Sequence, residues 1–219
     1  ENVILANGSV PVELPFMKYG NNVISSREAL SLPELPEHVV VVGGGYIGLE
    51  LGITYKMLGS DVTIVEAEDS ILPIFDKELR RPLELFVKKN KIKVNTGVFA
   101  KGVEDTKDGK TKLFFIDKNA KEGTKPEEIL ADKILVTVGR KPNSDALKPT
   151  GVALNERGFV KVNNRCETNM KGVYAIGDVC DSGEMLAHVA SFQGEMVAEI
   201  ISGKKRAYDP VAVPAIVFT

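Results

Sequence analysis

The sequence predicts an α/β protein with a parallel sheet followed by an antiparallel meander. The prediction starts from three neighbouring stretches: a valine run at Val39–Val42, a glycine-rich turn leading into the apolar segment Leu49–Leu58, and a second β-branched run at Asp61–Val65. An unbroken β-branched run is typical of a strand buried on both faces, and the apolar segment has the length of a helix. Strand, turn, helix and strand in this order predict a parallel sheet.

The glycines of the turn have the spacing that admits a dinucleotide. We expect Gly43 to permit the sharp turn, Gly45 to let a pyrophosphate approach the backbone, and Gly48 to let the helix press against the strand. The helix amino terminus offers unpaired N–H groups and the positive end of its dipole to phosphates. The whole predicted binding loop is Gly43, Gly44, Gly45, Tyr46, Ile47 and Gly48. A tight turn that binds nothing is the alternative interpretation of the same pattern.

The second β-branched run ends in Glu66, which lies 66 − 43 = 23 positions after the first glycine of the turn. An acid at about this distance accepts hydrogen bonds from the hydroxyl pair of an adenosine ribose. A carboxylate repels the 2′-phosphate of NADP, and no arginine stands beside Glu66 to reverse that preference. The carboxylate of Glu66 therefore predicts NAD rather than NADP.

The segments around this unit predict further elements. Asn2–Ala6 is predicted as a strand, and 16–36 as a connector with one short helix near Ser25–Leu32. Either Ser25 or Ser26 is expected to cap that helix, with Glu28 in its first turn. After the acid, Asp76–Asn90 is predicted as a helix whose first residue is the candidate N-cap. Ile92–Thr96 is predicted as the third parallel strand.

The pattern then changes to the meander. Val103–Thr106 and Lys112–Ile116 flank an Asp-Gly pair, which is a hairpin signal. A polar loop is expected at 118–128, followed by a buried strand at Ile134–Val138. The proline and asparagine in Gly139–Asn143 mark a crossing between two structural units.

The carboxyl-terminal part returns to single strands and one long helix. Phe159–Val162 is predicted as a strand, and Gly172–Ile176 as another that has Asp178 just beyond its carboxyl end. Ligands of open α/β sheets bind at that edge. A helix is predicted from Met185 to about Ser202, with the following glycine as its C-cap.

The composition excludes several classes of function. The chain has 219 residues, of which 43% are hydrophobic and 26% charged, and its formal charge is −2. Without a basic field, nucleic acid is not expected as a partner, and no apolar run approaches the ~20 residues that span a membrane. Cys166 and Cys180 are the only cysteines. Without a signal peptide, they are expected as free thiols in a reducing compartment: the cytoplasm, or the mitochondrial matrix or plastid of a eukaryote.

Six short motifs in a fixed order resemble those of the pyridine nucleotide–disulfide oxidoreductases. They are Ala6-Asn7-Gly8-Ser9, Gly43-Gly44-Gly45-Tyr46-Ile47-Gly48-Leu49-Glu50, Val65-Glu66, Gly139-Arg140-Lys141-Pro142-Asn143, Tyr174-Ala175-Ile176-Gly177-Asp178 and Met185-Leu186-Ala187-His188. The resemblance extends over essentially the whole chain, and it is strongest to the branch of the family that oxidises dihydrolipoamide with NAD.

The resemblance implies a Rossmann-like NAD-binding domain, a parallel sheet plus an antiparallel meander, inserted between parts of a FAD-binding α/β domain. The implied partition is 1–15 as a remnant of the FAD domain, 16–36 as a linker, 37–143 as the NAD-binding domain, 144–208 as the second FAD-domain segment and 209–219 as the start of a dimerisation domain.

The resemblance also implies contacts to both cofactors. Those to FAD come from Asn7, Gly8 and Ser9 at the flavin nucleotide, Asp178 at the ribityl and pyrophosphate part, and the backbone of Met185, Leu186, Ala187 and His188 at the flavin pyrimidine end. Those to NAD add Glu50 near the nicotinamide, with Val98 and Gly139 lining the site. Plainer alternatives stay open: Asp178 as the cap of the following helix, Glu50 as an exposed acid, His188 as a helix residue without chemistry, and Cys180 as a buried small hydrophobe.

The family also needs parts that this sequence does not contain: an amino-terminal flavin GxGxxG, a CxxxxC redox pair and a carboxyl-terminal His/Glu base. The sequence is therefore expected to be the central piece of a homodimeric enzyme, with no catalytic residue of its own. The complete enzyme would pass electrons from dihydrolipoamide, carried on a lipoyl-domain protein of a 2-oxoacid dehydrogenase complex, through the disulfide to FAD and then as hydride to NAD. We expect the chain alone to bind NAD weakly or moderately, to hold FAD poorly and to show no dehydrogenase turnover.

Two other functions fit the same residues. One is another NADH-dependent flavin disulfide reductase of the superfamily, such as a mercuric or CoA-disulfide reductase. The other is a non-catalytic NAD-binding module that senses the ratio of NADH to NAD.

Overall fold

The computed structural model describes residues 1–219, which form two compact units. The central unit comprises Pro11–Gly139 and Val217–Thr219, and the terminal unit comprises Glu1–Val10 and Arg140–Ile216. The α/β class predicted from the sequence is confirmed, with parallel strands in both units and an antiparallel sheet in the central one.

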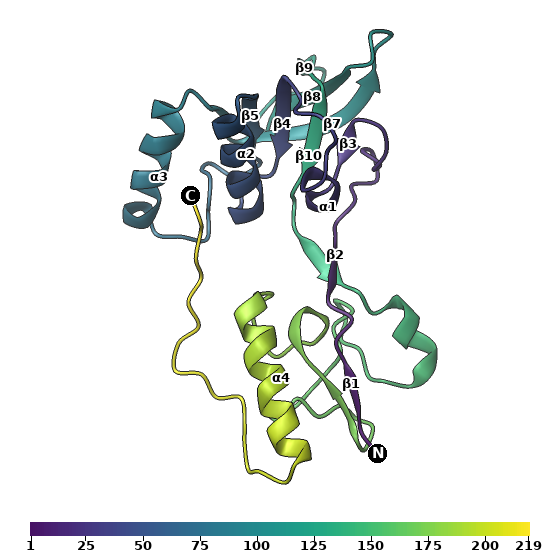
Figure 1. Ribbon diagram of the computed structural model, residues 1–219. Helices are drawn as coiled ribbons and strands as arrows, with labels where there is room; N and C mark the ends of the chain where they lie inside the picture. Colours follow the sequence, from purple (N-terminus) through teal and green to yellow (C-terminus); the bar gives the residue numbers. More distant parts are fainter. The chain divides into compact units, whose positions relative to one another are not determined.

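The central unit is built on a five-stranded parallel sheet with the order β3-β10-β4-β5-β6 (Figure 1). Its strands are β3 (Val23–Ile24), β4 (His38–Val42), β5 (Asp61–Val65), β6 (Lys93–Asn95) and β10 (Lys133–Val136). Four of them overlap the predicted runs, although β10 ends at Val136, two residues before the predicted end. Strand β3 was not predicted, because a two-residue strand inside the 16–36 connector leaves no periodic pattern.

The valine run is unbroken because the sheet is covered on both faces. Val39 and Val41 belong to the core cluster that contains residues of helices α1 (Ser26–Ala29), α2 (Tyr46–Leu58) and α3 (Lys77–Lys89). Val40 and Val42 belong to a second cluster, shared with the antiparallel sheet. The helices and the antiparallel sheet therefore form the two outer layers of this unit (Figure 1). Burying each valine contributes about 1.5–3 kcal/mol.

The antiparallel sheet consists of β7 (Val98–Asp105), β8 (Thr111–Asp117) and β9 (Glu127–Ala131). The predicted Asp-Gly hairpin joins β7 to β8. Strand β9 was missed, since its first residues fall in the segment 118–128 that was predicted as a loop. Most of β9 is exposed, so its sequence lacks the apolar alternation that identifies a strand.

The terminal unit has β1 (Val3–Leu5) parallel to β12 (Val173–Ala175), and β2 (Ser9–Pro11) paired with β11 (Arg140–Pro142). The remaining elements are two 3₁₀ turns, η1 (Asp145–Thr150) and η2 (Gly177–Val179), and helix α4 (Ala187–Ile201). None of the helices in either unit has the length and apolar character that a membrane crossing requires.

The prediction of a strand at Phe159–Val162 is wrong. Val160 makes only isolated bridges, to Leu154 and Cys180. The amide of Val160 donates to the carbonyl of Val179 at 2.9 Å, whereas the amide of Lys161 donates to Ala153 at 2.9 Å. Because the backbone partner changes from one residue to the next, no ladder forms.

Candidate functional site

The glycine turn follows β4 directly and shows three different steric situations. Gly43 has φ +109°, and a Cβ there would lie 2.6 Å from the carbonyl oxygen of Thr137. A Cβ on Gly48 would lie 2.1 Å from the carbonyl oxygen of Gly43. A Cβ on Gly45 would meet no protein atom within 4 Å. Packing against the protein's own backbone therefore requires glycine at positions 43 and 48, whereas Gly45 faces open space.

Glu66 faces this turn from the end of β5. Its Oε2 accepts a hydrogen bond from the amide of Gly44 at 2.5 Å, and its Oε1 accepts one from the amide of Glu68 at 2.8 Å. The side chain is buried, with 8% of its residue surface exposed. A carboxylate has about four acceptor positions, so two remain for further donors.

Val98 and Thr137 close the neighbouring edge of the turn. The amide of Val98 donates to the carbonyl of Glu66 at 3.1 Å, which brings the predicted Val98 beside the acid. The hydroxyl of Thr137 donates to the carbonyl of Gly43 at 3.0 Å, and Gly139 follows two residues later. Thr137 was not predicted; its only sequence signal is a hydroxyl at the carboxyl end of a buried strand.

Helix α2 begins at this turn without a capping side chain. Gly45 is its N-cap, no side chain accepts from its first amides, and its first turn holds no acid. By contrast, the short helix α1 has a complete capping box made by Ser25 and Glu28, as its serine predicted. The first turn of α2 therefore lies at the open glycine turn, where the positive end of the helix dipole favours an anion.

Glu50 lies in the second turn of α2 and does not point freely into solvent. Its Oε1 accepts a hydrogen bond from the amide of Phe218 at 2.9 Å, so this carboxylate holds the last residues of the chain against the central unit.

In the terminal unit, the predicted flavin residues meet at one edge. Since β1 and β12 are parallel neighbours, the segments after them lie side by side. Ser9 donates its hydroxyl proton to Asp178 Oδ2 at 2.6 Å. Asn143 holds the segment before Ser9, because its amide donates to the carbonyl of Gly8 at 2.9 Å and its side chain donates to the carbonyl of Asn7 at 3.2 Å.

Arg140 joins the same cluster and was not predicted as a site residue. Its Nε donates to Ser9 Oγ at 2.7 Å and its Nη2 donates to the carbonyl of Ser9 at 2.7 Å. The sequence contained it only as part of the crossing segment, because the contact between positions 9 and 140 is visible only in the folded chain.

Asp178 lies in η2 and is not the cap of the following helix. The N-cap of α4 is Leu186, which offers no side-chain acceptor, and the first turn of α4 holds no acid. The predicted segment from Met185 to His188 therefore spans the start of α4 and leaves its first amides without a capping partner.

Both cysteines are free and buried. Burial raises the pKa of Cys166 to about 12 and also raises the pKa of Cys180. Both thiols are therefore protonated near neutral pH, and neither supplies the thiolate that disulfide exchange requires.

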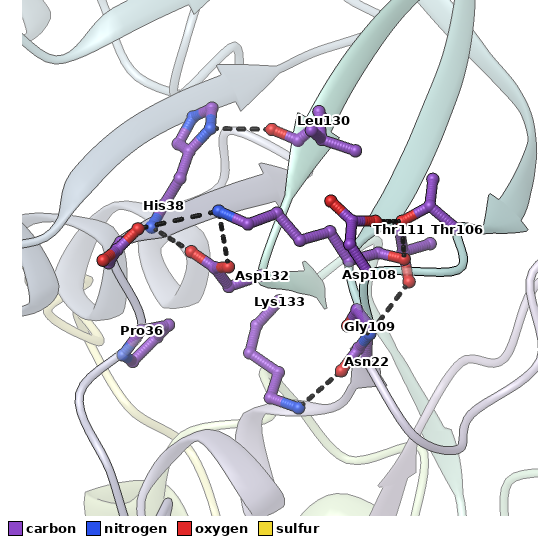
Figure 2. Close-up of polar contacts among 12 residues, drawn as sticks. Asn22, Pro36, His38, Thr106, Asp108, Gly109, Thr111, Leu130, Asp132 and Lys133 are labelled. Atoms are coloured by element: carbon purple, nitrogen blue, oxygen red, sulfur yellow. Dashed lines mark hydrogen bonds and ion pairs between the residues drawn. The ribbon is translucent and has the colours of Figure 1, made fainter.

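One polar network lies at the opposite edge of the central sheet, at the amino ends of its strands (Figure 2). Asp132 Oδ2 accepts from the amide of His38 at 2.7 Å, and Asp132 Oδ1 pairs with Lys110 at 3.0 Å. The His38 ring lies 2.9 Å from the Leu130 carbonyl through Nδ1 and 2.9 Å from Thr63 Oγ1 through Nε2. This network ties the β7–β8 hairpin to the sheet and explains His38 as a structural residue.

Two surface recesses lie elsewhere. One, of about 390 Å³, lies beside α3 and β6, and the other, of about 640 Å³, is formed by residues 1–2 and 167–174 of the terminal unit. Neither is lined by a predicted site residue.

Comparisons with known proteins support the family resemblance. The chain is 41% identical over 222 residues to the dihydrolipoyl dehydrogenase of Bacillus subtilis and 46% identical over 223 residues to that of Pseudomonas aeruginosa. These alignments cover 100% of this chain and 46% and 45% of the relatives, so the chain spans about half their length.

The fold is similar to those of two solved structures. LpdA from Mycobacterium tuberculosis matches with a TM-score of 0.86 and 27% identity, over 100% of this chain and 46% of that one. A mutant of the HOCl-induced flavoprotein disulfide reductase RclA from Escherichia coli, in complex with Cu(II), matches with a TM-score of 0.87 and 26% identity, over 99% of this chain and 48% of that one.

The family model of pyridine nucleotide-disulphide oxidoreductases matches residues 1–194. Members of that family use FAD and NAD, which agrees with an open glycine turn in one unit and an Asp178 cluster in the other. This chain belongs to the pyridine nucleotide-disulphide oxidoreductase family.

Proposed function

We propose that this chain binds NAD through its glycine turn and forms part of a dihydrolipoyl dehydrogenase. The observation that carries the proposal is the buried carboxylate of Glu66, which faces a turn that is open beside Gly45 and continues into an uncapped helix. The protein itself places no atom within 4 Å of a Cβ on Gly45, so a pyrophosphate could approach the backbone there.

The parts of NAD match this geometry in order. The pyrophosphate would accept hydrogen bonds from the first amides of α2, where the helix dipole favours negative charge. The adenosine ribose would donate its hydroxyl protons to the free acceptor positions of Glu66. Val98, Gly139 and Glu50 would complete the site, with Glu50 toward the nicotinamide.

The terminal unit would hold FAD. Asp178 would accept from the ribityl and pyrophosphate part, with Asn7, Gly8 and Ser9 against the nucleotide. Arg140 would add positive charge there, since its guanidinium lies against Ser9. The uncapped start of α4, from Met185 through Leu186 and Ala187 to His188, would face the pyrimidine end of the flavin.

The whole protein would be a homodimeric oxidoreductase that accepts dihydrolipoamide from a lipoyl-domain protein of a 2-oxoacid dehydrogenase complex. When bound, the flavin supplies hydride transfer between the redox disulfide and NAD. This chain would contribute the two nucleotide-binding surfaces, with the NAD-binding domain at 37–143 between FAD-domain segments at 1–15 and 144–208. Dihydrolipoyl dehydrogenase is favoured over another flavin disulfide reductase because the relatives at 41% and 46% identity are both dihydrolipoyl dehydrogenases.

The variant Gly45→Asp tests the NAD site. The backbone there has φ −75° and ψ −179°, which an aspartate adopts readily, and its carboxylate would cap the bare amides of α2. We expect the thermal midpoint to stay equal or rise, while calorimetric titration shows NAD affinity weakened at least about tenfold, or about 1.4 kcal/mol. The matched control is Gly102→Asp, which makes the same charge change at another open position and should leave NAD binding unchanged. Undiminished NAD affinity in Gly45→Asp would overturn the proposed site.

A further inference from the structure

The turn that carries Asp178 is held by a polar side chain from the interior of α4. Gln193 has only 1% of its surface exposed. Its Oε1 accepts a hydrogen bond from the amide of Gly177 at 2.7 Å, and its Nε2 donates to Ser182 Oγ at 2.7 Å. One carboxamide therefore bridges the two sides of the 177–182 turn.

Cys180 closes this bridge into a ring. Its sulfur lies 3.0 Å from Ser182 Oγ and donates to the carbonyl of Gly177 at 3.2 Å. The three side chains of Gln193, Ser182 and Cys180 thus connect the amide and the carbonyl of one residue, Gly177, which immediately precedes Asp178.

Gly177 also lies in close contact with the helix. It has φ +68°, and a Cβ there would lie 2.9 Å from the Cβ of Ala190. The ring and this contact together leave the turn little freedom to shift along α4.

A polar residue at position 193 needs an explanation. The neighbouring buried positions of α4 are Val189, Met196 and Val197, so an apolar side chain would suit this face. A buried amide left without partners costs roughly 1–3 kcal/mol for each lost hydrogen bond. Gln193 avoids that cost only because the 177–182 turn supplies partners for both ends of its carboxamide.

We propose that Gln193 is a positioning residue: it fixes the 177–182 turn and thereby holds Asp178 toward Ser9 and Arg140. The ring itself is independent of any ligand, and only the consequence for flavin binding rests on the proposed function. Gln193 acts on Asp178 only through the backbone of Gly177 and does not itself contact the cofactor.

Thiol labelling of the 219-residue chain tests the ring without any cofactor. Cys180 belongs to the ring, while Cys166 is buried in the same unit outside it and reports general opening. Gln193→Met keeps the side-chain length and removes the carboxamide's hydrogen bonds with Gly177, Ser182 and Cys180. We expect it to speed the labelling of Cys180 at least about tenfold, with Cys166 within about twofold, as measured by peptide mass spectrometry. Equal acceleration of both cysteines, or of neither, would overturn the proposal.

Gln193→Glu is the conservative variant, because it keeps an acceptor for the amide of Gly177 and can accept from Ser182. Its Cys180 labelling should stay within about threefold of the parent rate. FAD titration of the whole protein then tests the consequence: Gln193→Met should weaken FAD affinity at least about fivefold, whereas Gln193→Glu should keep the parent affinity. Unchanged FAD affinity in Gln193→Met, alongside weakened affinity in Asp178→Ala, would overturn the positioning role. If Asp178→Ala also leaves FAD affinity unchanged, the proposed flavin site has failed, and the labelling rates alone decide the ring.

Discussion

Replacing Glu66 by glutamine removes its charge while keeping its shape, and the structure determines what this costs. The carboxylate accepts from two backbone amides, that of Gly44 at 2.5 Å and that of Glu68 at 2.8 Å. A glutamine has a single acceptor oxygen, so its NH₂ group must face one of these N–H groups. Leaving one buried N–H without an acceptor costs about 1–3 kcal/mol, and the free energy of unfolding of the central unit should fall by this amount.

The same change should weaken NAD binding. Hydrogen bonds to a charged acceptor contribute about 1.5–3 kcal/mol, against about 0.5–1.5 kcal/mol for a neutral one. Losing the charge of Glu66 should therefore lower NAD affinity by roughly fivefold to tenfold. NADP should not weaken in parallel, because the repulsion between the carboxylate and the 2′-phosphate disappears. Glu66→Arg should go further and admit NADP, at a larger cost in stability because both amides lose their acceptor.

The assay is calorimetric titration of NAD and NADP, combined with urea unfolding. Glu68→Gln is the matched control, since it makes the same chemical change on an exposed side chain two positions away. It should alter neither coenzyme preference nor stability by more than about 0.5 kcal/mol. If Glu66→Gln leaves the ratio of NAD to NADP affinity as it was, the carboxylate does not contact the ribose.

Two other predictions concern stability. Gly48→Ala should destabilise the central unit by about 1–3 kcal/mol in urea unfolding, because its Cβ would lie 2.1 Å from a backbone oxygen. Gly52→Ala in the same helix is the control: its Cβ would meet only side chains at 3.4–3.5 Å, so the change should be neutral or stabilising. Equal effects of the two substitutions would refute the steric reasoning. Asp132→Asn should reduce the loss of stability in acid: burial raises the pKa of Asp132, but the amide of His38 and the ammonium of Lys110 outweigh it and hold that pKa below 3.8. A carboxyl group whose pKa is lower in the folded state than in the unfolded state stabilises the fold at any pH above the unfolded pKa. This stabilisation is lost as the pH falls through the folded pKa. The free energy of unfolding, measured from pH 6 to pH 2, should therefore fall less steeply in the variant than in the parent.

The parts of the fold that were predicted correctly depend on contacts close in sequence. The unbroken run at Val39–Val42 predicts a strand covered on both faces, because alternate valines pack into the apolar cores on the two sides of the sheet. The glycine spacing and the acid at position 66 lie within one βαβ unit, so their mutual geometry follows from the standard dimensions of strand, turn and helix. Elements with few buried residues left no such pattern, and β3 and β9 were missed for that reason.

The site around Asp178 shows the opposite case. Its acid could be singled out at the end of a predicted strand, but its partners could not be worked out from the sequence. The contact of Ser9 with Asp178 and that of Arg140 with Ser9 join positions that are 169 and 131 residues apart along the chain. The role of Gln193 could not be predicted either, because no pattern in a helical sequence shows that a buried carboxamide will bridge the 177–182 turn.

Local order and burial periodicity were therefore enough to establish from the sequence the α/β class, the glycine turn and an acid at the right spacing. The folded chain alone decided that Glu66 points at the turn, that no atom fills the space beside Gly45, and that Arg140 reaches Ser9. The reason is physical: secondary structure follows from the preferences of neighbouring residues, whereas a side chain's partner is chosen by tertiary packing, which brings distant segments together.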